Sequence, residues 1–122
     1  MGTLPTSTAP SASALQKYGA MVSLANPDKH ERAWMDAITR LGCIACRVDG
    51  LGYSPAVVHH IIKHGRRVGH LFTLPLCMPH HSLGERSERC ISRHPWHRAF
   101  EKRYGSELLL LDIVRQLVDR GK

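Results

Sequence analysis

The chain has 122 residues, enough for one compact domain and a tail. Lysine and arginine outnumber the acidic residues 17 to 10, and the formal net charge of +7 favours a polyanionic partner, without saying whether it is DNA, RNA or anionic lipid. No run of about 18 apolar residues occurs and no signal peptide is recognisable, so we expect a cytoplasmic protein with no membrane partner. In that compartment the four cysteines are expected to bind metal rather than to form disulfides.

The beginning of the chain differs in composition from the rest. Residues 1–26 are rich in Ser, Thr, Ala and Pro and carry almost no charge. Such a segment cannot bury enough apolar surface to offset the entropy lost on ordering. We therefore predict a flexible arm over residues 1–26 and one folded domain over residues 27–122.

The first predicted element of this domain is a helix. Residues 26–28 supply a start signal, with proline and an acid near the first turn. Trp34, Ile38 and Leu41 follow at helical spacing, and Gly42 ends the run.

A β-hairpin and a helix are predicted in the middle of the chain. Residues 56–62 are a β-branched run typical of a strand. The basic segment 63–70 contains two glycines and is predicted to form the loop, and residues 71–76 are predicted to return as the second strand. Pro75 restricts this strand to an edge or an irregular stretch. Residues 77–81 then enter a helix with a proline in its first turn, which makes the expected fold class α+β.

Two more helices are predicted after a polar and basic loop over residues 84–94. The first runs from Pro95 to Tyr104 and the second from Ser106 to about Arg120. An apolar stripe on the last helix is expected in the core or at a dimer contact, and it consists of Leu109, Ile113 and Leu117.

Two pairs of possible metal ligands, Cys43 with Cys46 and Cys77 with His80, each enclose two residues. This spacing lets both side chains of a pair reach one tetrahedral zinc ion without backbone strain. About 30 residues separate the pairs, more than the 15–20 of a usual zinc finger but enough for a whole hairpin. A redox Cys-x-x-Cys is the alternative, although its βαβ context is absent. We therefore predict a structural zinc ion that stabilises a small core.

The sequence does not assign a metal-binding role to the remaining cysteine and several histidines. Three potential ligands lack a convincing fourth partner and are interpreted as surface residues: Cys90, His94 and His97. His64 and His70 are likewise predicted on the loop surface. The exchange of His81 for His80 as fourth zinc ligand stays open at this point.

Three histidines are candidates for catalysis. His59 and His60 lie in the predicted first strand, and His81 follows the second ligand pair directly. Neighbouring residues of a strand point to opposite faces, so His59 and His60 can serve one site only if the strand ends or twists there. Gly65, a few residues further on, makes such a break in the strand possible. Phosphodiester hydrolysis needs a cation to neutralise developing charge and a base to deprotonate water. One histidine on a metal and a neighbour free to take a proton would meet both needs.

Residues 55–61 and 73–81 resemble the HNH (ββα-metal) nuclease motif. The surroundings are similar to the phage RecA-dependent nucleases, also called recombination-enhancement nucleases, over about residues 30 to 111. The segments that carry this similarity are Cys43-Ile44-Ala45-Cys46-Arg47, Gly65-Arg66-Arg67, His70, and Phe100-Glu101-x-x-Tyr104-Gly105-Ser106-Glu107.

The resemblance implies a zinc-stapled ββα core and assigns roles to matching residues. His59 and His81 would hold a divalent catalytic ion, magnesium or manganese, and His60 would be the general base. The implied partners are DNA and a recombinase filament. Many HNH proteins carry an asparagine before the second strand, where this chain has Phe72-Thr73. The Thr73 hydroxyl is a candidate substitute, with His70 contributing to the same site.

Basic side chains cluster in the predicted hairpin loop and again between Arg86 and Arg103. Lys63, Arg66 and Arg67 are expected to bind phosphates, contacts that position DNA without reading its sequence. The arginines between Arg86 and Arg103 could bind phosphates in the same way, but a solvated charged surface explains them equally well.

These patterns predict a metal-dependent DNA endonuclease that hydrolyses phosphodiester bonds, on recombinase-bound DNA if the resemblance extends that far. The alternative is a non-catalytic zinc-containing nucleic-acid-binding module, in which His59, His60 and His81 would only bind phosphate. A redox or zinc-relay protein is a third hypothesis, and it would require a reactive Cys43.

Overall fold

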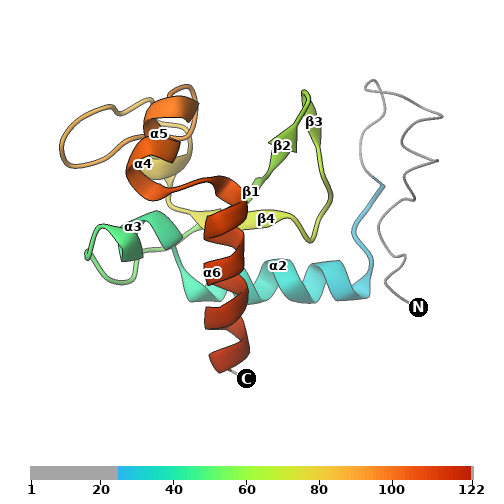
Figure 1. Cartoon of the computed structure of the whole chain (residues 1–122). Helices are drawn as coiled ribbons and strands as arrows, with labels where there is room; N and C mark the ends of the chain where they lie inside the picture. Colours follow the sequence, from blue (N-terminus) through green and yellow to red (C-terminus); the bar gives the residue numbers. More distant parts are fainter. Residues whose placement is uncertain (1–24, 122) are drawn as a thin grey trace.

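A computed structural model describes residues 25–121 and shows a small α+β fold with helices and two small antiparallel sheets (Figure 1). The elements are α2 (Lys29–Leu41), α3 (Ile44–Val48), β1 (Val57–His60), β2 (Ile62–Lys63), β3 (Arg66–Arg67), β4 (Thr73–Leu76), α4 (Met78–His81), α5 (His97–Tyr104) and α6 (Glu107–Arg120). The predicted α+β class is confirmed at this level. The predicted arm over residues 1–26 lies almost wholly outside the described residues, and among the described helices none is long and apolar enough to cross a membrane.

Helix α2 begins and ends where the sequence predicts. The Asp28 carboxylate accepts a hydrogen bond from the Glu31 N–H at 2.8 Å, and the Glu31 carboxylate accepts one from the Asp28 N–H at 2.9 Å. This reciprocal capping satisfies two N–H groups that a helix start leaves free. The helix ends at Gly42, where φ is 88° and a Cβ atom would lie 2.8 Å from the Ser54 carbonyl oxygen. Glycine at this position lets the chain turn at once into the first cysteine pair.

The predicted hairpin consists of two short ladders. Strands β1 and β4 pair antiparallel with His60 opposite Thr73, and β2 pairs with β3. Between the ladders, the N–H of the fully buried Ile61 donates to the Phe72 carbonyl, and the Ile61 carbonyl accepts from the Val68 N–H. The first strand is therefore shorter than predicted and breaks directly after His60.

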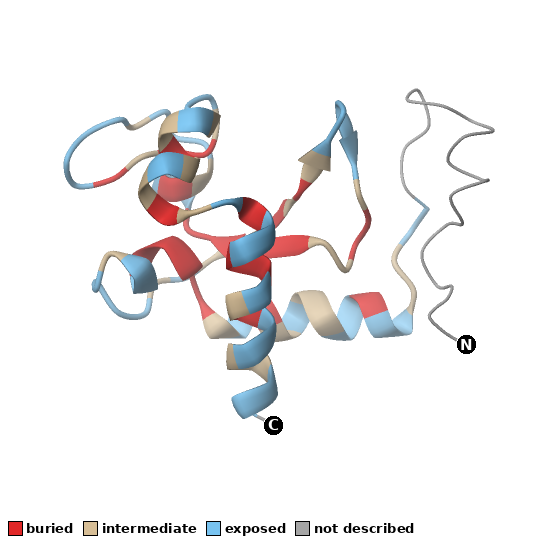
Figure 2. Ribbon diagram, in the orientation of Figure 1, coloured by how far each residue is buried: buried red, intermediate tan, exposed pale blue. Residues whose placement is uncertain are grey.

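The core lies where α2, β4 and α6 meet, and β4 is buried along its whole length (Figure 2). Pro75 is tolerated because β4 pairs on one side only, as the sequence predicted. The buried apolar residues of α6 are Leu110, Leu111 and Val114. The predicted stripe was therefore wrong in phase, because Leu109 is 55% exposed while Ile113 and Leu117 are only partly buried. A run of four leucines gives every helical face an apolar residue, so periodicity alone did not fix which face is inside.

A single helical turn, α4, follows β4 through Cys77 and carries a proline in its first turn, as predicted. The backbone N–H groups of Arg93 and His94 donate to the carbonyls of His80 and His81, at 2.7 and 2.9 Å. These bonds satisfy carbonyls that a helix end leaves free and fix the polar loop against α4. Helix α5 then begins two residues later than predicted.

Candidate metal centre and active site

The four predicted zinc ligands lie together and are buried. The Cys46 sulfur is 3.7 Å from the Cys77 sulfur, and Nδ1 of His80 lies 3.5, 3.1 and 3.6 Å from the sulfurs of Cys46, Cys77 and Cys43. Two sulfurs that bind one tetrahedral zinc ion at ~2.3 Å stand about 3.8 Å apart. The spacing of these side chains therefore fits a shared metal ion, and none of the four cysteines is in a disulfide.

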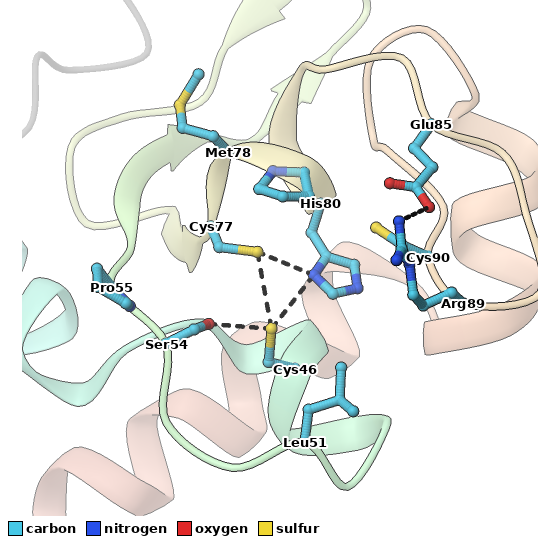
Figure 3. A pocket seen from close by; sticks show the side chains of 11 residues that line it. Cys46, Leu51, Ser54, Pro55, Cys77, Met78, His80, Glu85, Arg89 and Cys90 are labelled. Atoms are coloured by element: carbon cyan, nitrogen blue, oxygen red, sulfur yellow. Dashed lines mark hydrogen bonds and ion pairs between the residues drawn. The ribbon is translucent and has the colours of Figure 1, made fainter.

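The structure also decides between His80 and His81. The His80 ring points at the sulfurs of Cys46 and Cys77 (Figure 3), whereas the His81 ring lies against His59. Successive residues of a helix point about 100° apart, so one turn presents them to two different centres. His80, and not His81, therefore accompanies the three cysteines.

The cysteine cluster has a chemistry that suits a cation. Burial raises the pKa of Cys43 and Cys46, which disfavours free thiolates. The Ser54 hydroxyl donates to the Cys46 sulfur at 3.0 Å, and the Cys46 N–H donates to the Cys43 sulfur at 3.3 Å. Such donors stabilise thiolates, and a bound divalent ion deprotonates its thiol ligands outright.

Behind His80 lies a polar network that the sequence analysis missed. Nε2 of His80 is 2.9 Å from the Tyr104 hydroxyl and 3.4 Å from Asp49, and the Tyr104 hydroxyl donates to Asp49 at 2.9 Å. Arg103 forms an ion pair with Asp49 at 3.2 Å. Partners of this kind fix the ring orientation of a ligand histidine. The only sequence signal was the place of Tyr104 in the resemblance, because Asp49 falls in an ordinary loop.

A second cluster contains three histidines. The ring centroids of His59, His81 and His94 are 5.2 to 5.3 Å apart, and one nitrogen from each lies within 4.8 Å of the others. His59 and His81 were predicted to share a site, and the structure brings them together. His94 was interpreted as a surface residue, which was wrong: it is partly buried in this cluster because its backbone caps α4. Cys90, its proposed neighbour at the surface, is buried elsewhere.

A buried ion pair supports this cluster. Glu107, the first residue of α6, is hydrogen-bonded through Oε2 to Nε2 of His59, and Arg93 Nε donates to the same oxygen at 3.1 Å. Although burial raises it, these hydrogen bonds from His59 and Arg93 lower the pKa of Glu107 to about 2. A carboxylate only accepts hydrogen bonds, so Nε2 of His59 carries a proton and a neutral ring keeps its lone pair on Nδ1. Arg93, one of the arginines interpreted as either phosphate-binding or solvated, is neither: its side chain is buried because its partner Glu107 is buried.

The other two rings of the cluster are held neutral. Burial, together with the nearby rings of His59 and His94, lowers the pKa of His81 to about 4. Burial also lowers the pKa of His94. Neutral imidazoles are good ligands for divalent transition ions.

His60 is not a member of this cluster, and its ring pairs with His70. Nε2 of His70 donates to the Ala25 carbonyl at 2.7 Å, so its Nδ1 accepts from Nε2 of His60 at 3.0 Å. The basic nitrogen of His60 is then Nδ1, and burial, with help from Arg67, lowers the pKa of this ring to about 4. His70 was predicted on the surface, which was wrong: it is 8% exposed, and the Thr73 hydroxyl donates to its carbonyl at 3.0 Å.

The three predicted phosphate-binding side chains are exposed on the β2–β3 hairpin, which projects from the core (Figure 2): Lys63, Arg66 and Arg67. His64, at the tip of the same hairpin, is exposed as predicted. In the second predicted basic cluster, not every arginine is available to bind phosphate, because Arg93 and Arg103 form ion pairs with acidic side chains.

A family model described as recombination enhancement, RecA-dependent nuclease matches residues 27–119. The chain belongs to this family. Among curated proteins, none matches the chain. Membership in the RecA-dependent nuclease family points to a nuclease and hence to DNA, and the match spans both the cysteine cluster and the histidine cluster.

Proposed function

We propose that this member of the family is a metal-dependent DNA endonuclease of the HNH (ββα-metal) type. The observation that carries the proposal is the cluster of His59, His81 and His94, which presents three imidazoles to one point. Two paired strands followed by a short helix, β1, β4 and α4, agree with the strand–strand–helix order of that motif.

In this proposal His59, His81 and His94 hold the catalytic ion, and Glu107 with Arg93 fixes the His59 ring. A bound divalent ion would neutralise charge that develops on the phosphate and the leaving oxygen. A set of three imidazoles suits manganese or another transition ion better than magnesium, which prefers oxygen ligands. His60 accepts the proton of the attacking water at Nδ1, because its Nε2 is already bonded to His70.

The cysteine cluster has a structural part in the same proposal. A zinc ion there would join the Cys43–Cys46 pair before and within α3 to the Cys77–His80 pair at α4. Helix α4 would then hold His81 at a fixed distance from β1, and so from His59. Such a zinc ion would take no part in hydrolysis, because Cys43, Cys46, Cys77 and His80 would fill all four tetrahedral positions.

A non-catalytic nucleic-acid-binding module is the competing function. It would use the same exposed hairpin and the same cysteine cluster. The histidine cluster argues against it, because His59 is 2% exposed and burial lowers the pKa of His81 to about 4. Neutral, buried rings attract a cation more readily than a phosphate.

Nicking of supercoiled plasmid tests the proposed function. We expect zinc-loaded protein to nick DNA with manganese or magnesium, to stop in a chelator that leaves zinc bound, and to recover when manganese is added back. Parallel reactions with and without a recombinase filament on the DNA show whether the dependence in the family's name applies to this chain. Absence of cleavage with every ion and both DNA forms, at normal DNA binding, would establish the binding module instead.

The exposed hairpin leads to a separate prediction about salt. Arg66→Ala is expected to weaken DNA binding and to reduce the slope of log K against log salt by about 0.9, the value for one phosphate contact. Arg120→Ala is the matched control, because Arg120 is exposed at the far end of α6 (Figure 1). Fluorescence anisotropy over a salt series measures both slopes. An Arg66→Ala slope equal to that of the wild type would remove the hairpin from the DNA interface.

A further inference from the structure

We propose a second divalent-cation site, formed by His97, Glu101 and Glu107 beside the histidine cluster. Nε2 of His97 lies 3.4 Å from Oε1 of Glu101 and 3.6 Å from Oε1 of Glu107. One ligand atom from each residue lies within 4.8 Å of the others. His97 and Glu101 are one turn apart on α5 and share a face, and Glu107 meets them from the first turn of α6.

The spacing is that of atoms around an ion rather than of a hydrogen-bonded pair. Ordinary N–H···O hydrogen bonds measure about 2.7–3.2 Å, shorter than both distances at His97. Two ligand atoms that bind one tetrahedral ion at ~2.1 Å stand about 3.4 Å apart. Nε2 of His97 is also buried without a hydrogen-bond partner among the described residues. A buried polar atom without a partner is costly, and an ion between the three side chains would satisfy it.

The donors define what would bind. One imidazole and two carboxylates suit a borderline divalent ion such as manganese or zinc. Only the Glu107 carboxylate is paired with the Arg93 guanidinium, so the two carboxylates and this guanidinium carry a formal charge of −1 and a dication is electrostatically favoured. His97 and Glu101 keep 43% and 34% of their side-chain surface exposed, which leaves room for water or a phosphate oxygen as further ligands.

Glu107 links this site to the histidine cluster. Its Oε2 is bonded to His59 and Arg93, while its Oε1 faces His97. A cation on Oε1 would therefore be separated by one carboxylate from the His59 ring, which is a metal ligand in the proposed function. Pairs of cations that share a carboxylate are a known arrangement for phosphodiester cleavage. All three ligands of the second site lie on α5 and α6, however, so cation binding there does not depend on whether the histidine cluster cleaves DNA.

Manganese binding tests the inference directly. Zinc-loaded protein is titrated with Mn²⁺, and free Mn²⁺ is measured by electron paramagnetic resonance. We expect the wild type to bind one more equivalent of Mn²⁺ per chain than either His97→Gln or Glu101→Gln. His97→Gln removes the imidazole without changing formal charge, and Glu88→Gln, at an exposed acid outside the cluster, controls for the charge lost in Glu101→Gln. Zinc content and melting temperature verify that each variant is folded.

The outcomes separate this inference from the proposed function. Identical Mn²⁺ stoichiometry and affinity in the wild type and in His97→Gln overturn the second site, even if the wild type nicks plasmid. Loss of one equivalent in both site variants but not in Glu88→Gln supports it, even if the wild type fails to nick. An affinity that falls equally in Glu101→Gln and Glu88→Gln, with His97→Gln unchanged, shows a general charge effect and also overturns the site.

Discussion

The His60→Ala variant is expected to lose plasmid nicking by a factor of about 10² to 10⁴, the usual contribution of a general base. The ring that is removed is neutral at pH 7, because burial lowers its pKa to about 4. It is also held in one tautomer by the chain of hydrogen bonds through His70 to the Ala25 carbonyl. DNA affinity and zinc content should stay at wild-type values, since His60 belongs to none of the three candidate metal clusters.

Single-turnover nicking with saturating manganese is the appropriate measurement, because it isolates the chemical step from product release. His30→Ala is the control, at an exposed histidine on α2. His70→Gln adds a graded test, because an amide can still accept from His60 and donate to Ala25. A His60→Ala variant that cuts at the wild-type rate would show that the base is another group.

Removal of the cysteine cluster is expected to have the largest effect on stability. Structural zinc binds in small peptides with apparent energies of roughly 10–16 kcal/mol, which equals or exceeds the whole stability of a typical domain. The Cys46→Ser variant should therefore lose its zinc and its cooperative unfolding transition at room temperature. The same loss is expected when a strong chelator strips the wild type, and added zinc should reverse it.

Cys90→Ser provides a matched control because Cys90 is 5% exposed but lies outside the cluster. A buried hydroxyl in place of its thiol is expected to cost about 1–3 kcal/mol while zinc content stays unchanged. Zinc per chain from elemental analysis and urea unfolding curves measure both effects. Wild-type protein that contains no zinc and melts like Cys46→Ser would contradict the structural role.

The sequence predicted those parts of the site that depend on short spacings. Two residues between Cys43 and Cys46, and again between Cys77 and His80, fix ligand geometry locally, so their meeting required only a hairpin between them. The strand on which His59 lies was similarly evident from its β-branched neighbours. The family resemblance named in advance is confirmed by the match over residues 27–119.

The missed parts are those set by tertiary contacts. His94 lies in a loop without periodicity, and only the capping of α4 by that loop brings it to His59. Glu107 resembles an ordinary acid in a first helical turn, and its contact with His59 depends on where α6 packs. His70 looked like a loop residue because nothing in the sequence shows that its ring meets the Ala25 carbonyl.

Helix α4 is a single turn whose last two residues, His80 and His81, face different centres. Peptide geometry ties these neighbours together within a few ångströms, so neither can shift alone. A two-electron oxidant that joined Cys46 and Cys77, whose sulfurs are 3.7 Å apart, in a disulfide would remove two of the four ligands of a zinc ion. His80 would then be released and His81 displaced from the other two histidines of its cluster. If the chain cleaves DNA as proposed, the redox state of sulfur atoms that take no part in hydrolysis would then control whether cleavage occurs.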